Sequence, residues 1–269
     1  MEPDSVRHML ITGLPRAGTT LLTALVDGLE DCVALSEPEE VVDLARATRD
    51  AASLSQAILG FHRRTAGQLL AGDCVMDIRS SDGSPVTDYV QRDSAAISVE
   101  KPRNTLARSE LPSDFLLATK HNSLYTALLD PLLALDVFRM LAVVREPLDL
   151  LRSWLDVPFP IARGRLPGAE RYWPELAEVA QSARPVRVRQ AMIMELIVQR
   201  FLFNSDRIAL LRYEDLVADP NQVAALVNRD WRMKVPIRVR SKTAPTAAEA
   251  RELKALLMDM APGAWALYH

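Results

Sequence analysis

The segment from Gly13 to Thr20, Gly-Leu-Pro-Arg-Ala-Gly-Thr-Thr, combines residue types that can bind a phosphate group. Its two glycines let the backbone approach a ligand closely, Arg16 supplies a full charge, and the two threonines add hydroxyl donors. The segment lies between the apolar run His8–Thr12 and a helical pattern that begins at Gly18. Because backbone N–H groups converge at such a helix start, the sequence predicts an anion-binding loop. The alternative is an ordinary tight turn.

The glycine spacing resembles that of the ATP-binding P-loop, with one departure. That loop carries Lys and then Ser or Thr directly after its second glycine. Here Thr19 follows Gly18, and the basic residue is Arg16. Without that lysine and a matched acidic magnesium ligand, nucleoside triphosphate hydrolysis loses support. An ATP-dependent small-molecule kinase is therefore kept only as an alternative.

Pro15-Arg-Ala-Gly-Thr-Thr20, followed by leucines, resembles the 5′-phosphosulfate loop of sulfotransferases. The resemblance implies 3′-phosphoadenosine-5′-phosphosulfate (PAPS) as the sulfuryl donor and 3′,5′-ADP as a product. It assigns the 5′-phosphosulfate to Pro15, Arg16, Ala17, Gly18, Thr19 and Thr20.

The family also has a second anion site for the donor's 3′-phosphate, formed by an arginine at a strand end and a serine in the next helix. Arg145 follows the apolar run Phe138–Val144, and Ser153 lies two turns into a predicted helix that Pro147 opens. Asp149 and Ser153 share one face of that helix. The leucines at 148, 151 and 155 share another. The resemblance therefore assigns the 3′-phosphate to Arg145 and Ser153.

Three further residues receive roles from the resemblance. Tyr213, in Tyr-Glu-Asp-Leu after an apolar run, would lie near the adenosine, unless these residues only form a turn. Lys120 follows the apolar run Phe115–Thr119, where open α/β sheets place ligands, and would polarise the sulfuryl group. Arg16 would share its catalytic role, because both cations can stabilise the negative charge that grows as the 5′-phosphate leaves. Lys242, in the basic stretch 238–246, could close over the donor phosphates or belong to a surface loop.

Glu37 and His121 are the two candidates for the base that accepts the acceptor's proton. Glu37 lies 21 residues after Arg16, where tyrosylprotein-type and related bacterial sulfotransferases carry a catalytic glutamate. Cytosolic sulfotransferases instead carry Lys-x-His, whereas Lys120 and His121 are adjacent. Consecutive strand residues point to opposite faces, so these two should not share the site unless the strand ends there. We therefore favour Glu37 and keep His121 open.

Apolar runs alternate with amphipathic stretches along the chain, which indicates a parallel sheet. We predict an α/β fold: a P-loop-type three-layer domain with a central, largely parallel sheet flanked by helices. Residues 1–269 form one domain, with substrate or lid segments at 73–101 and 156–174. Predicted strands are 8–12, 115–119, 138–144 and 207–211, with fragments 74–78 and 95–99 also possible. Predicted helices are 18–29, 42–70 with a break near Gly60, 148–155, 191–203, 221–228 and 247–260.

The composition excludes several classes of protein. With 269 residues, 49% of them hydrophobic, and a net charge of −3, the chain is neither disordered nor a binder of nucleic acid through a broad basic face. The two cysteines, Cys32 and Cys74, cannot form a disulfide framework and are expected to be buried. The four histidines are scattered, so no metal site is expected. No signal peptide or membrane span is predicted, and we expect a cytoplasmic protein.

Together these features predict a PAPS-dependent sulfotransferase that needs no metal. It would act on a hydroxyl, less readily an amine, of a small metabolite, with carbohydrate, lipid and peptide-tyrosine acceptors left open. Besides the kinase, a non-catalytic nucleotide-binding module is an alternative, although such a module has no need of Lys120 and Glu37 beside the loop. The sequence leaves the acceptor's identity and the oligomeric state open.

Overall fold

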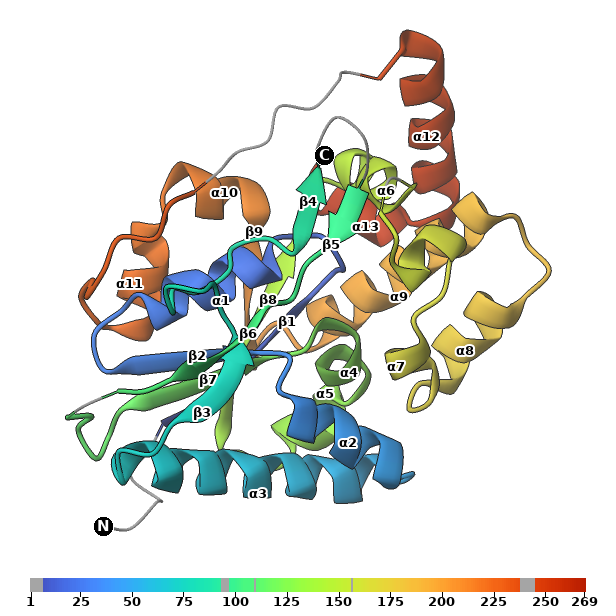
Figure 1. Cartoon of the computed structure of the whole chain (residues 1–269). Coiled ribbons are helices and arrows are strands. Elements are labelled where there is room, and N and C mark those ends of the chain that lie inside the picture. Colours follow the sequence, from blue (N-terminus) through green and yellow to red (C-terminus); the bar gives the residue numbers. More distant parts are fainter. Residues whose placement is uncertain (1–6, 93–96, 109, 156, 238–244) are drawn as a thin grey trace.

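The computed structural model describes residues 7–92, 97–108, 110–155, 157–237 and 245–269. Its centre is a parallel sheet of five strands in the order β2-β7-β1-β8-β9 (Figure 1). The strands are β1 (Arg7–Gly13), β2 (Cys32–Ser36), β3 (Val75–Ile78), β4 (Val90–Arg92), β5 (Ile97–Val99), β6 (Arg103–Leu106), β7 (Leu116–Lys120), β8 (Phe138–Val144) and β9 (Ile208–Arg212).

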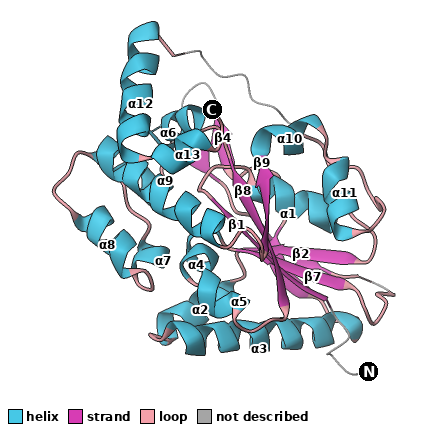
Figure 2. Cartoon of the chain, turned by 180° about the vertical axis from the view of Figure 1, so that it is seen from behind, coloured by secondary structure: helices cyan, strands magenta, loops and turns pink. Residues whose placement is uncertain are grey.

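Helices cover both faces of this sheet, with α1 and α11 on one side and α3, α4 and α5 on the other (Figures 1 and 2). Parallel strands buried on both faces are continuous apolar runs, and every residue of β2 and β7 is buried. The α-helices are α1 (Thr19–Asp27), α2 (Glu39–Ala47), α3 (Ala51–Leu70), α4 (Asn122–Ala127), α5 (Leu129–Leu133), α6 (Pro147–Leu155), α7 (Pro167–Glu170), α8 (Pro174–Gln181), α9 (Val186–Phe203), α10 (Tyr213–Ala218), α11 (Asn221–Val227), α12 (Ala247–Met260) and α13 (Pro262–Ala266).

Two small antiparallel pairs, β3 with β6 and β4 with β5, lie outside the main sheet. β3, β4 and β5 lie within the segment 73–101, for which the sequence offered only the possible strand fragments 74–78 and 95–99, and β6 follows that segment. Elsewhere in the fold, α9 packs against α8, α12 and α13. Among the described residues, no helix has both the length and the apolar composition to cross a membrane.

The α/β fold with helices on both sides of a parallel sheet is confirmed, and the four predicted strands of the main sheet are present within one residue at each end. The fifth strand, β2, was not predicted. The predicted helix break near Gly60 is wrong: Gly60 lies inside α3. The break falls before Ala51, where the Asp50 carboxylate accepts the Ser53 N–H at 2.6 Å and caps the new helix.

In α6, Leu150, Leu151 and Trp154 are buried, whereas Leu148 and Leu155 are only partly buried. Two smaller expectations need correction. Cys32 is buried as expected, but Cys74 is exposed, and both are free thiols. The segment 156–174 is not a plain loop, because its described residues include a 3-10 helix at Pro160–Arg163 and helix α7.

The five parallel strands all end at the same edge of the sheet. The chain leaves the central strand β1 for β2 on one side and later crosses to β8 on the other. Open α/β sheets bind ligands at such a switch point, outside the carboxyl ends of the strands.

Candidate active site

A cavity of about 1120 Å³ lies at this edge of the sheet. The residues that follow each of the five strands contribute to its wall. It is lined by the predicted site residues Pro15, Arg16, Gly18, Thr19, Thr20, Glu37, Lys120, His121, Arg145, Ser153 and Tyr213. Ala17 is fully buried beneath the loop and does not line the cavity. Lys242 lies outside the described residues.

The loop between β1 and α1 has the backbone of an anion-binding turn. Gly18 has a φ of 99°, and a Cβ there would lie 2.4 Å from Cδ2 of Tyr213, so only glycine fits beneath that ring. Arg16 also has a positive φ, of 68°. No side chain caps α1 and its first turn holds no acidic residue. The N–H groups of that turn therefore remain available to an anion.

Two hydrogen bonds join this loop to the second predicted anion site. Trp154 Nε1 donates to the carbonyl of Pro15 at 2.6 Å, and Arg145 Nη1 donates to the carbonyl of Arg16 at 3.1 Å. The Arg145 guanidinium also stacks on the ring of Tyr213, 4.4 Å from its centroid. The residues assigned to the two donor phosphates thus form one connected wall.

Arg16 reaches across the cavity. Its Nη1 lies 3.0 Å from Oδ1 of Asp88, and the same carboxylate oxygen accepts the Val90 N–H at 2.9 Å. The loop is therefore coupled to the segment that leads into β4, a contact that the sequence did not indicate.

Glu37 and Lys120 meet at the ends of neighbouring strands, because the register of β2 and β7 pairs Ser36 with Lys120. Lys120 Nζ donates to Glu37 Oε1 at 2.7 Å and to the hydroxyl of Tyr89 at 3.2 Å. The other carboxylate oxygen of Glu37 forms an ion pair with Lys101. The side chain of Lys120 is only 1% exposed. Because water hardly reaches its ammonium group, the Glu37 carboxylate is the main group that balances its charge.

The two lysines set the charge of Glu37. Burial alone would raise the pKa of its carboxyl, but the ammonium groups of Lys120 and Lys101 outweigh burial and hold that pKa well below its usual range. Burial would lower the pKa of Lys120, but Glu37 and Tyr89 outweigh burial and raise it. Both groups are therefore charged at neutral pH.

His121 shares the cavity with Lys120, because β7 ends at Lys120 and His121 is the N-cap of α4. The expected objection, that adjacent strand residues face opposite ways, does not apply here. His121 Nδ1 accepts the Leu124 N–H at 3.4 Å. Burial, with Lys120 and Lys101, lowers the pKa of its imidazole to about 4 although Glu37 opposes this. At neutral pH the ring is therefore uncharged.

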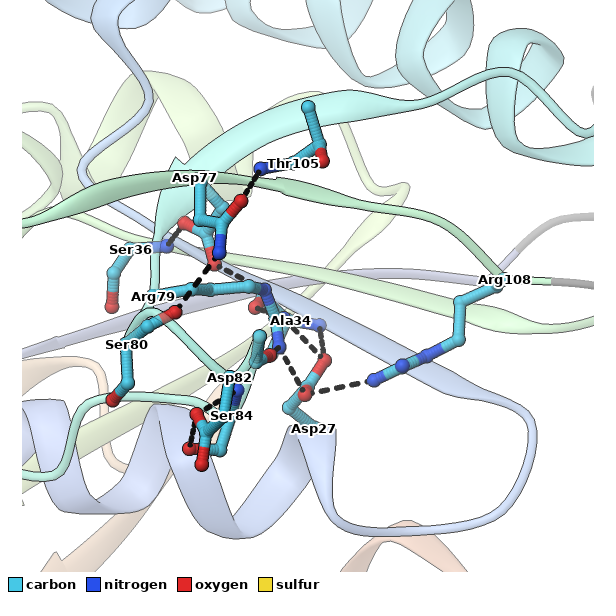
Figure 3. Close-up of polar contacts among 12 residues, drawn as sticks. Asp27, Ala34, Ser36, Asp77, Arg79, Ser80, Asp82, Ser84, Thr105 and Arg108 are labelled. Carbon is cyan, nitrogen blue, oxygen red and sulfur yellow. Dashed lines mark hydrogen bonds and ion pairs between the residues drawn. The ribbon is translucent and has the colours of Figure 1, made fainter.

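A buried charge cluster of Asp27, Asp77, Arg79 and Arg108 holds β2 in place (Figure 3). β2 is an edge strand, so the amides on its outer side have no neighbouring strand. Asp27 Oδ1 accepts the Ala34 N–H at 3.1 Å, and Asp77 Oδ1 accepts the Ser36 N–H at 2.7 Å. These carboxylates replace the missing strand as hydrogen-bond acceptors for a buried edge.

The two guanidiniums balance the two carboxylates of this cluster. Arg79 lies 3.0 Å from Asp27 and 3.2 Å from Asp77, and Arg108 lies 2.9 Å from Asp27. Burial raises the pKa of Asp77 to about 6, although the Ser36 N–H and Arg79 favour its charged form. Since Ser36 directly precedes Glu37, the cluster fixes the backbone from which Glu37 reaches Lys120.

Sequence reasoning missed Asp88, Tyr89, Lys101 and the whole charge cluster. One signal was available: Asp27 lies at the end of the apolar helix α1, where an acidic residue needs a buried partner. No comparable signal marks the other residues. Among the described residues, no group of three or more His, Cys, Asp or Glu side chains is placed to hold a metal ion.

Comparison with known proteins gives a family and a distant structure. A family model described as "Sulfotransferase family" matches residues 9–229. A crystal structure of a sulfotransferase from Alicyclobacillus acidocaldarius has 13% sequence identity and a TM-score of 0.48, and the match covers 98% of this chain and 96% of the other. A search of curated proteins finds no match.

We predict that Asp77→Ala lowers the free energy of unfolding by about 3–5 kcal/mol, because it leaves Arg79 with one fewer counter-charge and the Ser36 N–H without an acceptor. Asp77→Asn is the matched control: its amide oxygen can still accept that N–H, and it removes a carboxylate that burial disfavours. We expect it to cost less than half as much. Urea unfolding measures both, and a loss below about 1 kcal/mol for Asp77→Ala would show that β2 does not depend on Asp77.

We predict that Gly18→Ala weakens binding of 3′,5′-ADP by about tenfold or more, because the new methyl group displaces the ring of Tyr213. Gly72→Ala is the control: Gly72 also has a positive φ, of 82°, but a Cβ there meets nothing within 4 Å. It shares the backbone strain without the clash. Calorimetric titration of both variants checks this, and equal affinities would contradict the role given to Gly18.

Proposed function

The chain belongs to the sulfotransferase family, and from that premise we propose that it transfers a sulfuryl group from PAPS to a hydroxyl group of a small acceptor, releasing 3′,5′-ADP. The observation that carries the proposal is the contact of 2.7 Å between Glu37 and the buried Lys120, beside an uncapped helix start. A binding module alone has no use for a carboxylate and an ammonium held together at this position.

In the proposed complex the donor's two anionic ends lie along the connected wall. Arg16 and the N–H groups of Gly18, Thr19 and Thr20 hold the 5′-phosphosulfate. Arg145 and Ser153 hold the 3′-phosphate, and Tyr213, which Arg145 already stacks on, lies against the adenosine. The fit is supported by the uncapped helix start and by an Arg145 Nε that is buried without a hydrogen-bond partner.

During transfer, the acceptor oxygen forms a bond to sulfur while the bond from sulfur to the bridging oxygen of the donor breaks. Glu37 takes the acceptor's proton. Arg16, Lys120 and the loop N–H groups stabilise the negative charge that develops on the departing 5′-phosphate, as hydrogen-bond donors at the edge of the sheet. Sulfuryl groups carry less charge than phosphoryl groups, so no metal is required.

The resting ion pair makes Glu37 a weak base, since both of its oxygens face lysines. In our proposal the donor removes this restraint. When Lys120 turns from Glu37 to the leaving oxygen, Glu37 loses one cation and its pKa rises toward that of an effective base. Proton abstraction is thereby linked to the presence of donor.

His121 is the weaker candidate for the base. Its Nδ1 is occupied by the Leu124 N–H, so the neutral ring carries its proton on Nε2 and has no free basic nitrogen. Its lowered pKa, about 4, also makes it a poor proton acceptor.

The acceptor side is proposed to be shaped by 73–101 and 156–174, within a single domain. Tyr89 and Lys101 from the first segment, and Phe159, Ile161 and Leu166 from the second, line the cavity. The rival kinase function predicts a requirement for magnesium and a preference for ATP. Binding of 3′,5′-ADP without magnesium, and transfer of labelled sulfur from PAPS, would decide between them.

We predict that Glu37→Gln lowers kcat by about 10²–10⁴-fold, because the amide cannot accept the proton. Its affinity for 3′,5′-ADP stays within a few-fold of the wild type. Glu40→Gln is the control, since Glu40 is an exposed carboxylate nearby that pairs with Arg64. Steady-state transfer assays and calorimetry check both variants. If Glu37→Gln kept activity within a few-fold, Glu37 would not be the base.

We predict that Lys101→Met moves the acid limb of the kcat/KM profile to higher pH. Removing one ammonium leaves burial less opposed, so the pKa of Glu37 rises and the base becomes protonated at a higher pH than in the wild type. Lys254→Met, a lysine on α12 outside the cavity, is the control and leaves the profile in place. An unchanged acid limb in Lys101→Met would rule out this coupling.

A further inference from the structure

A second, smaller pocket of about 560 Å³ adjoins the active-site cavity. The two share Pro160 and Pro167 as wall residues. Three arginines, Arg163, Arg165 and Arg189, line the smaller pocket together with Pro160, Pro167, Ala180, Gln181 and Ser182. No acidic residue is among the described residues that line it.

The pocket is a local concentration of positive charge in an acidic protein. Residues 163–189 contain six arginines and three glutamates, a net charge of +3, whereas the whole chain has −3. Glu170 is bound to Arg165. Within the part of the chain that the structure describes, neither Arg163 nor Arg189 has a carboxylate within ion-pair distance. Their charges are therefore not neutralised by the protein.

The pocket is also preformed. Arg189 Nη1 donates to the carbonyl of Arg184 at 2.6 Å, and its Nη2 donates to the carbonyl of Arg163 at 2.8 Å. A Cβ at Gly164 would lie 3.1 Å from Arg189, so the backbone turns closely around this side chain. Gln190 Nε2 donates to the carbonyl of Ile161 at 2.9 Å and ties the 3-10 helix to α9. An anion would therefore meet guanidinium charge held in place before binding.

The residues shared by the two cavities lie between the smaller pocket and the part of the active-site cavity that we propose binds the acceptor. A Cβ at Gly168 would lie 3.1 Å from Oγ of Ser123, so the segment after Pro167 touches the start of α4. Ser123 follows Lys120 by three residues and lines the same cavity. The donor's phosphates have their own cations, Arg16 and Arg145, on the wall formed by the β1–α1 loop and α6.

We propose that the arginine pocket binds an oxyanion of the acceptor, a carboxylate, phosphate or sulfate group that lies some distance from the hydroxyl that is sulfated. The inference rests on the proposed function and narrows it to anionic acceptors. Guanidinium groups bind such planar or tetrahedral oxyanions through charge-assisted hydrogen bonds. An acceptor with its hydroxyl at Glu37 would extend toward the pocket past Pro160 and Pro167, the residues that line both cavities.

The test uses ω-(4-hydroxyphenyl)alkanoates of increasing chain length and the primary amide of each, titrated into the whole 269-residue chain saturated with 3′,5′-ADP. We expect at least one acid to bind about tenfold more tightly than its amide, the difference that a charge-assisted hydrogen bond supplies. Arg163→Gln reduces this ratio to within about threefold, because it removes an exposed charge that the fold does not use. Arg184→Gln, an exposed arginine of the same segment outside the pocket lining, keeps the ratio.

Two outcomes overturn the inference. One is equal affinity of acid and amide at every chain length. The other is an equal loss of the preference for the acid in Arg163→Gln and Arg184→Gln. That result would show that the positive charge of the whole surface attracts the acid, rather than a specific contact in the pocket. Titration needs no turnover, so a failure of the proposed function shows separately, as absent binding of 3′,5′-ADP or absent transfer of labelled sulfur from PAPS in the wild type.

Discussion

The position of Glu37 depends on how the protein satisfies the outer edge of β2. This strand ends the central sheet and is buried, so its outward amides need acceptors that neither water nor another strand provides. Asp27 and Asp77 supply them, at 3.1 Å to Ala34 and 2.7 Å to Ser36. Burying two carboxylates is costly unless each is paired and hydrogen-bonded, which explains why Arg79 and Arg108 accompany them. The cluster thus leaves β2 short and keeps Glu37 at its end.

A second constraint, the parallel direction of the strands, explains why cations gather at one edge of an acidic protein. Parallel strands end together, so each strand end can bring one functional residue to the cavity without a long loop. Lys120 is the last residue of β7, Arg145 directly follows β8, and Arg16 lies in the loop that follows β1. Each is held by a protein oxygen: Asp88, Glu37 or the carbonyl of Arg16. The net charge of the whole chain gives no information on this arrangement, because the arrangement depends on which few charged side chains the fold brings to one cavity.

Features that depend on a short stretch of sequence, such as an apolar run and the residue after it, could be predicted. Features that depend on contacts between residues far apart in the sequence could not. The anion loop, Lys120 and Arg145 follow apolar runs that are visible in the sequence, and the register of β2 and β7 then brings Glu37 to Lys120. The break before Ala51 depends on the Asp50 cap rather than on Gly60, which a long helix tolerates when other residues pack its face. Tyr89 directly precedes β4, and Lys101 lies between β5 and β6, so both flank short antiparallel pairs with partly polar strands. Their placement depends on contacts with the main sheet, so composition alone gives little sign of it.

The two groups of arginines and lysines in this protein differ in what a ligand must displace. At the wall that we propose binds the donor, Arg16 and Lys120 already have carboxylate partners at 3.0 and 2.7 Å, so an incoming anion exchanges one ion pair for another. Such an exchange favours a ligand with several negative charges, because the ligand must replace the carboxylates of Asp88 and Glu37 as partners of the two cations. Asp88 and Glu37 then lose these ion pairs. At the arginine pocket, Arg163 and Arg189 hold no carboxylate among the described residues. A ligand with a single oxyanion would therefore displace no carboxylate there. In the proposed function this difference directs a highly charged donor to one site and a more weakly charged acceptor to the other.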